Sequence, residues 1–313
     1  MSKGGASKAC LLAVGCLLLP PVFSGSATAS EIYFIDAHSQ VDHEVTDLGL
    51  ILERMKEAGV SRTILAARSG RRPEEVADFA AKSGGRIVPA VRTKSEAYYR
   101  GNRRYFNQVS QQVASGKFTA MAEILLYHAR KGNKAPEVSV EPADERVKFA
   151  LDRAIEQGWP FVIHIEFESL DRSGRQRFMT EMEKLLAAHP AHPFPLNHLG
   201  QLDAAEVKRL IGAHGNIYFL TAHANPAITR LSRQPWRNMF DGDRLAPEWK
   251  ELMARHPDRF IFALDNVWET HWREHYLDQV AYWRKAVADL PPAVARAFAH
   301  GNAERLWKLP AER

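Results

Sequence analysis

Histidine and carboxylate side chains in this sequence follow short apolar runs. The first run, Tyr33–Gln40, turns polar at its end, where polar residues alternate with small or apolar ones. Residues two apart share one face of a strand, so Asp36, His38 and Gln40 are expected to project together from its C-terminal end. An imidazole at such a strand end is typical of the rim of a barrel site. A strand that simply runs into a polar loop is the alternative.

Later apolar runs carry the same residue types at or near their ends, at Glu123, His164, His198, His223 and Asp265. Any one of them is explained by a hydrogen-bonded histidine or a capping carboxylate. Together with His38 they make four imidazoles and two carboxylates at corresponding positions of the predicted strands. Separate hydrogen-bonding or capping roles do not readily explain so many residues of these types at the same positions. Imidazole and carboxylate are ligands for Zn, Mn or Fe, and they also serve general acid–base chemistry.

Eight strand-like runs must position these side chains, and amphipathic helical runs separate most of them. Strands are predicted at 32–41, 62–67, 86–91, 118–127, 160–167, 193–198, 217–222 and 259–264. Helices are predicted at 48–58, 73–82, 103–115, 143–157, 174–188, 204–213 and 276–290. Short apolar strands that alternate with helices predict an α/β fold, a closed (β/α)8 or TIM barrel, with its site at the C-terminal strand ends.

Two segments bear on this prediction. A doubly wound open sheet is the competing fold, but the glycine pair Gly84-Gly85 precedes a strand, so a dinucleotide site is poorly supported. The segment 225–257 is rich in Trp, Arg and Pro and is too long for a simple connection. It is predicted to form a functional loop or lid over the site.

The first 29 residues have the layout of a secretory signal peptide. Lys3 and Lys8 precede an apolar run, and Ala27-Thr28-Ala29 is a small-residue cleavage site. The prediction is a signal peptide at 1–29, one barrel domain at 30–313, and a periplasmic or secreted protein. Lipoprotein processing at Cys16 is the rival interpretation. Both cysteines lie in this segment, so the mature chain offers no disulfide or thiolate.

Charge and hydropathy limit the partners. The formal net charge is +5, and cleavage after Ala29 removes two lysines without changing the 37 acidic residues. The charges are interspersed, with no run of Lys and Arg that would mark a nucleic-acid face. No stretch after the leader is long enough and apolar enough to span a bilayer. We therefore expect a small-molecule substrate, no nucleic acid and no membrane partner, and a homo-oligomer stays open.

Several motifs together resemble the amidohydrolase superfamily, in particular its amidohydrolase-2 branch of barrel hydrolases and decarboxylases. They are Ile35-Asp36-Ala37-His38, Asn197-His198-Leu199-Gly200, Phe262-Ala263-Leu264-Asp265 and the closing stretch 301–309, Gly-Asn-Ala-Glu-Arg-Leu-Trp-Lys-Leu. The resemblance implies that His38 and His164 hold a divalent metal, either Zn, Mn or Fe. It implies that Asp265 is a ligand and the general base, that His198 polarises the substrate carbonyl or binds a second metal, and that Glu123 is a strand-four ligand or structural carboxylate.

One position departs from the family pattern. The family has His-x-His on strand one, whereas this chain has His38-Ser39-Gln40. Glutamine binds zinc far less well than imidazole does. Three outcomes stay open: a weaker metal site, metal-free catalysis like that of the branch's lactonases, or a non-catalytic binding descendant. Rescue by His43 would require the strand to end early.

The predicted reaction is hydrolysis of a small lactone, ester or amide by metal-activated water, with Asp265 as the base. Non-oxidative decarboxylation is the alternative within the branch. Arg68 and Arg92 follow strands two and three, where a guanidinium could hold a substrate carboxylate. The remaining substrate-binding candidates are Gln40, Tyr127, His223 and Trp268, with Trp236 and Trp272 as further aromatic candidates and Glu166 and Glu168 as residues that orient ligands.

Overall fold

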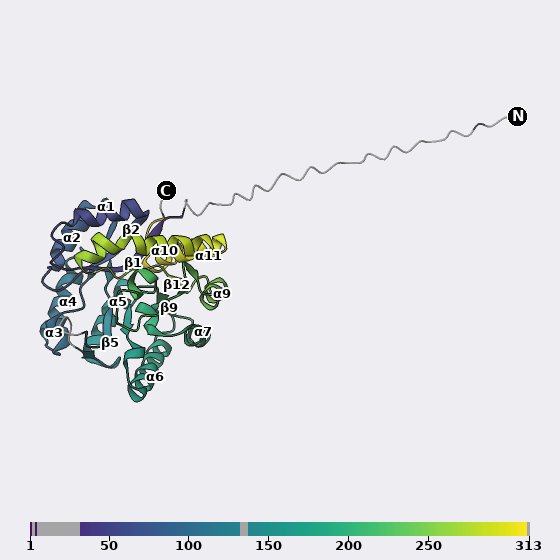
Figure 1. Cartoon of the computed structure of the whole chain (residues 1–313). Helices are drawn as coiled ribbons and strands as arrows, with labels where there is room; N and C mark the ends of the chain where they lie inside the picture. The colour runs from purple at the N-terminus through teal and green to yellow at the C-terminus, as the bar shows by residue number, and fades with distance from the viewer. Residues whose placement is uncertain (2–3, 5–31, 132–136, 312–313) are drawn as a thin grey trace.

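A computed structural model describes residues 32–131 and 137–311, together with Met1 and Gly4. The predicted signal peptide falls almost wholly outside these residues. Within them, no helix is both long and apolar enough to cross a membrane. The architecture is an eight-position barrel of parallel strands with helices around it, which confirms the predicted fold (Figure 1).

Each barrel position corresponds to a predicted apolar run. The strands are β1 (Phe34–Val41), β2 (Val60–Ala67), β3 (Ile87–Val91), β4 (Ala120–Met121) with β5 (Ile124–His128), β7 (Ile163–Ile165), β8 (Phe194–Leu196), β9 (Ile217–Leu220) and β12 (Phe260–Ile261). The fourth position is divided between β4 and β5, and Glu123 lies at the break. Neighbours pair in parallel along the chain order.

Backbone hydrogen bonds between the first and eighth positions close the ring. Ala37 N donates to Phe262 O over 3.0 Å, and Asp265 N donates to His38 O over 2.8 Å. Gln40 N donates to Asn266 O over 2.7 Å. A doubly wound sheet has two open edges, so this closure excludes it. The same bonds set the backbone of His38 beside that of Asp265.

The barrel helices are α1 (Gly49–Ala58), α2 (Pro73–Lys82), α4 (Arg104–Ala114), α5 (Glu145–Gln157), α6 (Arg172–Ala188), α7 (Ala204–Ala213), α9 (Pro247–Arg255) and α10 (Tyr276–Ala288). Local sequence sets their ends: Pro73 occupies the first turn of α2, and Gly59 ends α1 in a left-handed conformation. The first and last of these helices, α1 and α10, lie side by side (Figure 1).

Shorter elements join the barrel units. They are α3 (Glu96–Tyr99), β6 (Val138–Ser139), η2 (Phe167–Ser169), η3 (Asn197–Gln201), α8 (Pro226–Thr229), β10 (Phe240–Asp241), β11 (Arg244–Leu245), the π-helical turns η4 (His271–His275) and η5 (Ala297–Gly301), α11 (Pro292–Arg296) and α12 (Asn302–Trp307).

The segment 225–257 is not the single loop that composition predicts. It contains α8, the β10–β11 hairpin and the full barrel helix α9. Trp249, Leu252 and Met253 form the buried face of α9, and Pro247 occupies its first turn. That prediction is therefore wrong for the second half of the segment, which forms a nine-residue amphipathic helix. The first half does reach the site, through Trp236.

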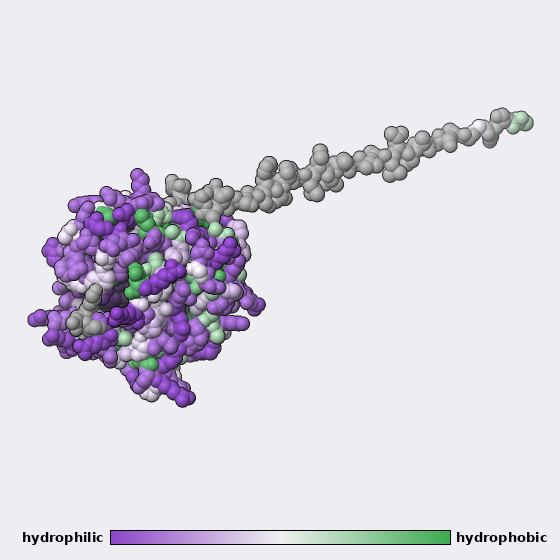
Figure 2. Space-filling model, viewed as in Figure 1, coloured by the Kyte–Doolittle hydropathy of each residue, from purple (hydrophilic) through white to green (hydrophobic). Residues whose placement is uncertain are grey.

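The strands are buried on both faces, as predicted. Small side chains fill the interior, among them Ala37, Ala66 and Ala90, and Leu306 and Trp307 of α12 pack against this interior cluster. Larger side chains fill the layer between strands and helices. The closing stretch thus forms a helix that covers part of the barrel interior. Outside, the face seen in Figure 2 is largely hydrophilic with scattered apolar residues.

Candidate active site

The first, fourth and eighth barrel positions place His38, Glu123 and Asp265 against one another. His38 Nε2 lies 3.5 Å from Glu123 Oε1 and 3.5 Å from Asp265 Oδ1. Exposure of these three residues is between 0% and 5%, so water screens their charges little. The structure therefore brings together the predicted ligands of strands one, four and eight. Exposed His43 instead pairs with Asp42.

Gln40 points at the two carboxylates with its amide nitrogen. Gln40 Nε2 donates to Asp265 Oδ1 over 2.6 Å and to Glu123 Oε1 over 3.4 Å. Asp36, which alternation places on the same face, binds the protein instead: it accepts hydrogen bonds from the Ser39 hydroxyl and from Leu264 N. A register shift in β1 between Asp36 and Ser39 accompanies this difference.

Glu123 is the most heavily contacted carboxylate of the site. Its Oε2 lies 2.7 Å from His164 Nδ1 and accepts a hydrogen bond from Asn197 Nδ2 over 2.5 Å. Its Oε1 pairs with the ammonium of Lys94. Burial alone would raise the pKa of Glu123, but Lys94, His164 and His38 hold that pKa well below its ordinary value. Glu123 is therefore an anion at neutral pH.

Asp265 contacts two histidines, which follow the strands β8 and β9. Its Oδ2 lies 3.2 Å from His198 Nε2, and its backbone carbonyl lies 3.2 Å from His223 Nε2. Burial raises the pKa of Asp265, yet the His198 hydrogen bond and the nearby His38 outweigh burial and hold the pKa well below its usual range. Burial lowers the pKa of both His198 and His223. The result is an ionised carboxylate flanked by neutral imidazoles.

The backbone is strained at these same residues. His198, His223 and Asp265 have φ angles of 53°, 60° and 51°. Left-handed backbone is uncommon outside glycine and costs free energy, so three such residues at the ends of neighbouring strands need support from the surrounding structure. Ligand atoms of these three side chains lie within 4.8 Å of one another.

A second carboxylate, Glu166, extends the site on the side of β5 and β7. Its Oε1 lies 3.1 Å from His164 Nε2 and 2.5 Å from Lys131 Nζ. Burial would raise its pKa, but His164 and Lys131 hold it far below the ordinary value. His164 lies between two carboxylates, which raise its pKa although burial opposes them. Glu166 therefore contacts His164, one of the predicted metal ligands, from a position where it could orient that imidazole.

A cavity of about 350 Å³ opens onto this cluster, a size suited to a small ligand. Arg68 and Trp268 face each other on its wall, with the guanidinium 4.8 Å from the ring centre. On another wall the Lys131 ammonium lies 4.3 Å from the ring centre of Trp236, and that ring stacks on His198 with centroids 4.4 Å apart. Arg68, Trp268, His223 and Trp236 therefore lie where a substrate would contact them.

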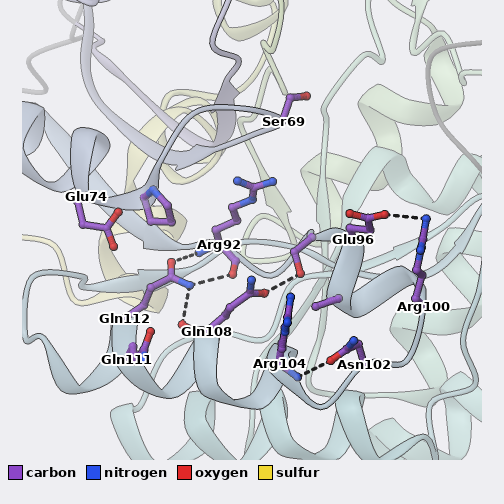
Figure 3. A pocket seen from close by; sticks show the side chains of 13 residues that line it. Ser69, Glu74, Arg92, Glu96, Arg100, Asn102, Arg104, Gln108, Gln111 and Gln112 are labelled. Atoms are coloured by element: carbon purple, nitrogen blue, oxygen red, sulfur yellow. Dashed lines mark hydrogen bonds and ion pairs between the residues drawn. The ribbon is translucent and has the colours of Figure 1, made fainter.

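Other expected substrate residues lie elsewhere. Arg92 lines a separate outer cavity of about 580 Å³ between the β2 and β3 loops and α4 (Figure 3), and its guanidinium donates to the backbone carbonyls of Lys94 and Arg71. Tyr127 packs on Phe178, 5.6 Å between ring centroids. Trp272 is fully buried against Tyr276, and Glu168 pairs with Arg237.

The chemistry and spacing of the three central residues fit a divalent metal. His38 Nε2 is buried and makes no hydrogen bond to the described residues. Ligand atoms about 2.0–2.2 Å from a tetrahedral zinc lie roughly 3.3–3.6 Å apart, and the two measured separations are 3.5 Å. Further groups of ligand atoms lie close by, formed by Glu123, His164 and His198, by His128, His164 and Glu166, and by His198, His223 and Asp265.

The sequence matches the family model described as Amidohydrolase over residues 112–309. The chain belongs to the amidohydrolase family. No curated protein matches the sequence significantly.

Solved structures share the fold at low identity. A 4-oxalomesaconate hydratase from Rhodopseudomonas palustris has a TM-score of 0.58 and 14% identity, covering 88% of this chain and 96% of its own. A probable 2-pyrone-4,6-dicarboxylic acid hydrolase from Acinetobacter baumannii, with citric acid bound, has a TM-score of 0.55 and 12% identity, covering 88% and 100%. An amidohydrolase from Burkholderia multivorans with bound zinc has a TM-score of 0.54 and 16% identity, covering 89% and 100%.

Sequence reasoning missed several residues of this amidohydrolase site. Lys94, Asn197, His128 and Lys131 all contact its carboxylates or line the cavity. Asn197 adjoins His198 in a motif already recognised, and His128 ends β5, so both carried a signal. Lys94 and Lys131 lie in loops, where lysine is usually a solvated residue, and no periodicity marks them as buried.

Proposed function

We propose that this amidohydrolase hydrolyses a small lactone, ester or amide that bears a carboxylate. The supporting observation is the ionised Asp265 at the floor of the cavity, held by Gln40 on one oxygen and by His198 on the other. A buried carboxylate with fixed partners and an open cavity above it is suited to general base catalysis.

The side chains have separate roles in this reaction. Asp265 takes the proton of an attacking water and later delivers it to the leaving oxygen or nitrogen. His198 donates a hydrogen bond that keeps Asp265 oriented and ionised. The ammonium groups of Lys94 and Lys131 line the cavity, and His164 carries a raised pKa, so positive charge surrounds the carbonyl oxygen as it becomes an oxyanion.

His38, Glu123 and Asp265 would hold a divalent metal, with zinc favoured and manganese or iron as alternatives. When bound, such an ion supplies Lewis acidity, which lowers the pKa of water and polarises a carbonyl oxygen. Hydrolysis without metal is the second candidate. The ion pair between Lys94 and Glu123 favours it, because an ammonium already neutralises one of the two carboxylates.

Two features support a carboxylated substrate. Arg68 and Lys131 line the cavity as cations held over aromatic rings, and Lys94 adds a third cation. A guanidinium on the wall can bind a carboxylate through two parallel hydrogen bonds. The probable dicarboxylic acid hydrolase from Acinetobacter baumannii, which shares the fold, has citric acid bound, and this is consistent with the choice.

The experiment is a turnover screen of the purified mature chain against carboxylated lactones, their amide analogues and aromatic carboxylic acids, with and without added zinc. Asp265→Asn should lower kcat/KM by about 10²–10⁴-fold, the usual contribution of a general base, while circular dichroism stays unchanged. A mutant that keeps more than a tenth of wild-type activity would remove Asp265 from this role. Carbon dioxide release from the aromatic acids would indicate a decarboxylase instead.

A further inference from the structure

Lys94 enters the candidate metal cluster from the loop after β3. Its exposure is 7%, and its ammonium pairs with Glu123 Oε1. That oxygen is the same atom that lies 3.5 Å from His38 Nε2 and belongs to the group formed with Asp265. The lysine therefore contacts the central ligand atom of the cluster, where a metal ion would also need to bind.

Hydrogen bonds made by neighbouring residues hold the loop that carries Lys94. The Thr93 hydroxyl donates to the backbone carbonyl of Glu123, so two consecutive residues bind the same glutamate. Arg92 Nε donates to Lys94 O over 2.7 Å. Gln112 of α4 in turn brackets Arg92, accepting from its backbone N over 2.7 Å and donating to its backbone O over 3.2 Å (Figure 3).

We propose that Lys94 competes with a divalent metal for Glu123. Metal binding then releases the Lys94 ammonium toward the cavity that it already lines, where it binds the carboxylate of the substrate. This inference rests on the proposed function. Metal binding frees the ammonium and so increases the affinity for a substrate anion. By linkage, the substrate anion increases the affinity for the metal by the same factor. The site would thus assemble fully only when metal and an anionic substrate are both present.

Lys131 and Arg68 do not share this position. Lys131 pairs with Glu166 and lies over Trp236, and Arg68 lies over Trp268. Each lines the same cavity and carries one positive charge. Of these three cations, Lys94 is the one whose ammonium pairs with the glutamate of the His38, Glu123 and Asp265 group. Arg68 is the matched control.

The test is zinc affinity, measured by competition with a chromophoric chelator, for wild type, Lys94→Met and Arg68→Met. Both variants remove one positive charge from the cavity. We expect Lys94→Met to bind zinc at least tenfold more tightly than wild type, and Arg68→Met to change the affinity less than threefold. Equal or weaker zinc binding by a folded Lys94→Met would overturn the inference while leaving the metal-dependent function intact. If neither wild type nor Lys94→Met binds zinc, both the inference and the metal-dependent route fail.

A second measurement needs no variant. Reductive methylation of the wild-type protein, followed by peptide mass analysis, reports how accessible the Lys94 amine is. Zinc at saturation should increase modification of Lys94, whereas exposed Lys117 should react equally in both conditions. Unchanged or reduced modification of Lys94 at zinc saturation would contradict the release of its ammonium.

Discussion

Gln40 and Asp265 are joined by a 2.6 Å hydrogen bond between residues 225 positions apart in the chain. The amide nitrogen also reaches Glu123 Oε1 at 3.4 Å, so one side chain donates to both carboxylates. An imidazole at position 40 could offer a nitrogen lone pair to a metal, whereas this amide offers protons to the metal's other ligands. Residue 40 therefore sets the balance between metal binding and internal hydrogen bonding.

Replacing this amide by imidazole should strengthen metal binding. Gln40→His adds a nitrogen ligand beside His38 and removes the amide that donates a hydrogen bond to Asp265 Oδ1. We expect the zinc dissociation constant to fall by tenfold or more, which corresponds to about 1.4 kcal/mol. Competition with a chelator measures it. Gln40→Leu is the control, because it removes the amide without adding a ligand; an equal gain in Gln40→Leu would assign the effect to the lost hydrogen bonds.

Zinc should stabilise the fold through His38. A ligand present at 100 times its dissociation constant raises the free energy of unfolding by about 2.7 kcal/mol. We expect zinc to raise the melting temperature of wild type but not of His38→Ala, and elemental analysis to show metal in wild type and none in His38→Ala. His43→Ala should respond like wild type, because His43 is exposed and pairs with Asp42. A full zinc shift in His38→Ala would place the metal elsewhere.

His128 should make the protein sensitive to acid. Burial, with help from Lys131 and His164, lowers the pKa of His128 from 6.5 to about 3. The unfolded chain therefore takes up this proton first as the pH falls, and the free energy of unfolding drops between about pH 6.5 and pH 3. One proton corresponds to about 1.4 kcal/mol per pH unit.

His128→Gln should flatten that slope. Urea denaturation between pH 4 and pH 7 measures the slope for wild type and His128→Gln. Parallel curves for His128→Gln and wild type would show that other groups carry the pH dependence. Glu166 raises the pKa of His128 and Lys94 lowers it. Wild type and His128→Gln are therefore compared at the same pH, where both groups are present in both proteins.

Arg68 should recognise the charge of the substrate. Arg68→Met is expected to raise KM for a carboxylated substrate by about 10–100-fold, the range of one or two charge-assisted hydrogen bonds, with kcat little changed. Arg68→Lys keeps the positive charge, so we expect its KM to rise less than that of Arg68→Met. The methyl ester of the same substrate is the control, because its KM should not respond; an equal loss on the ester would point to a packing role against Trp268.

The sequence by itself was sufficient for the barrel and for much of the site. Hydrophobic periodicity marks each strand, and parallel strands in a closed barrel bring their C-terminal ends to one face. The side chains of His38, Glu123, His164, His198 and Asp265 could therefore be grouped without coordinates. The helix α9 was not predicted, because the prediction for 225–257 rested on composition, which does not show the helical spacing of Trp249, Leu252 and Met253.

Only the tertiary structure decided how those side chains are used. Arg92 and Lys94 lie two residues apart in one loop, yet Arg92 binds backbone carbonyls outside the site while Lys94 pairs with Glu123 inside it. No local pattern distinguishes them, because a loop side chain takes its direction from segments far away in sequence. The same reason applies to Gln40, whose amide orientation is set by two carboxylates on other strands.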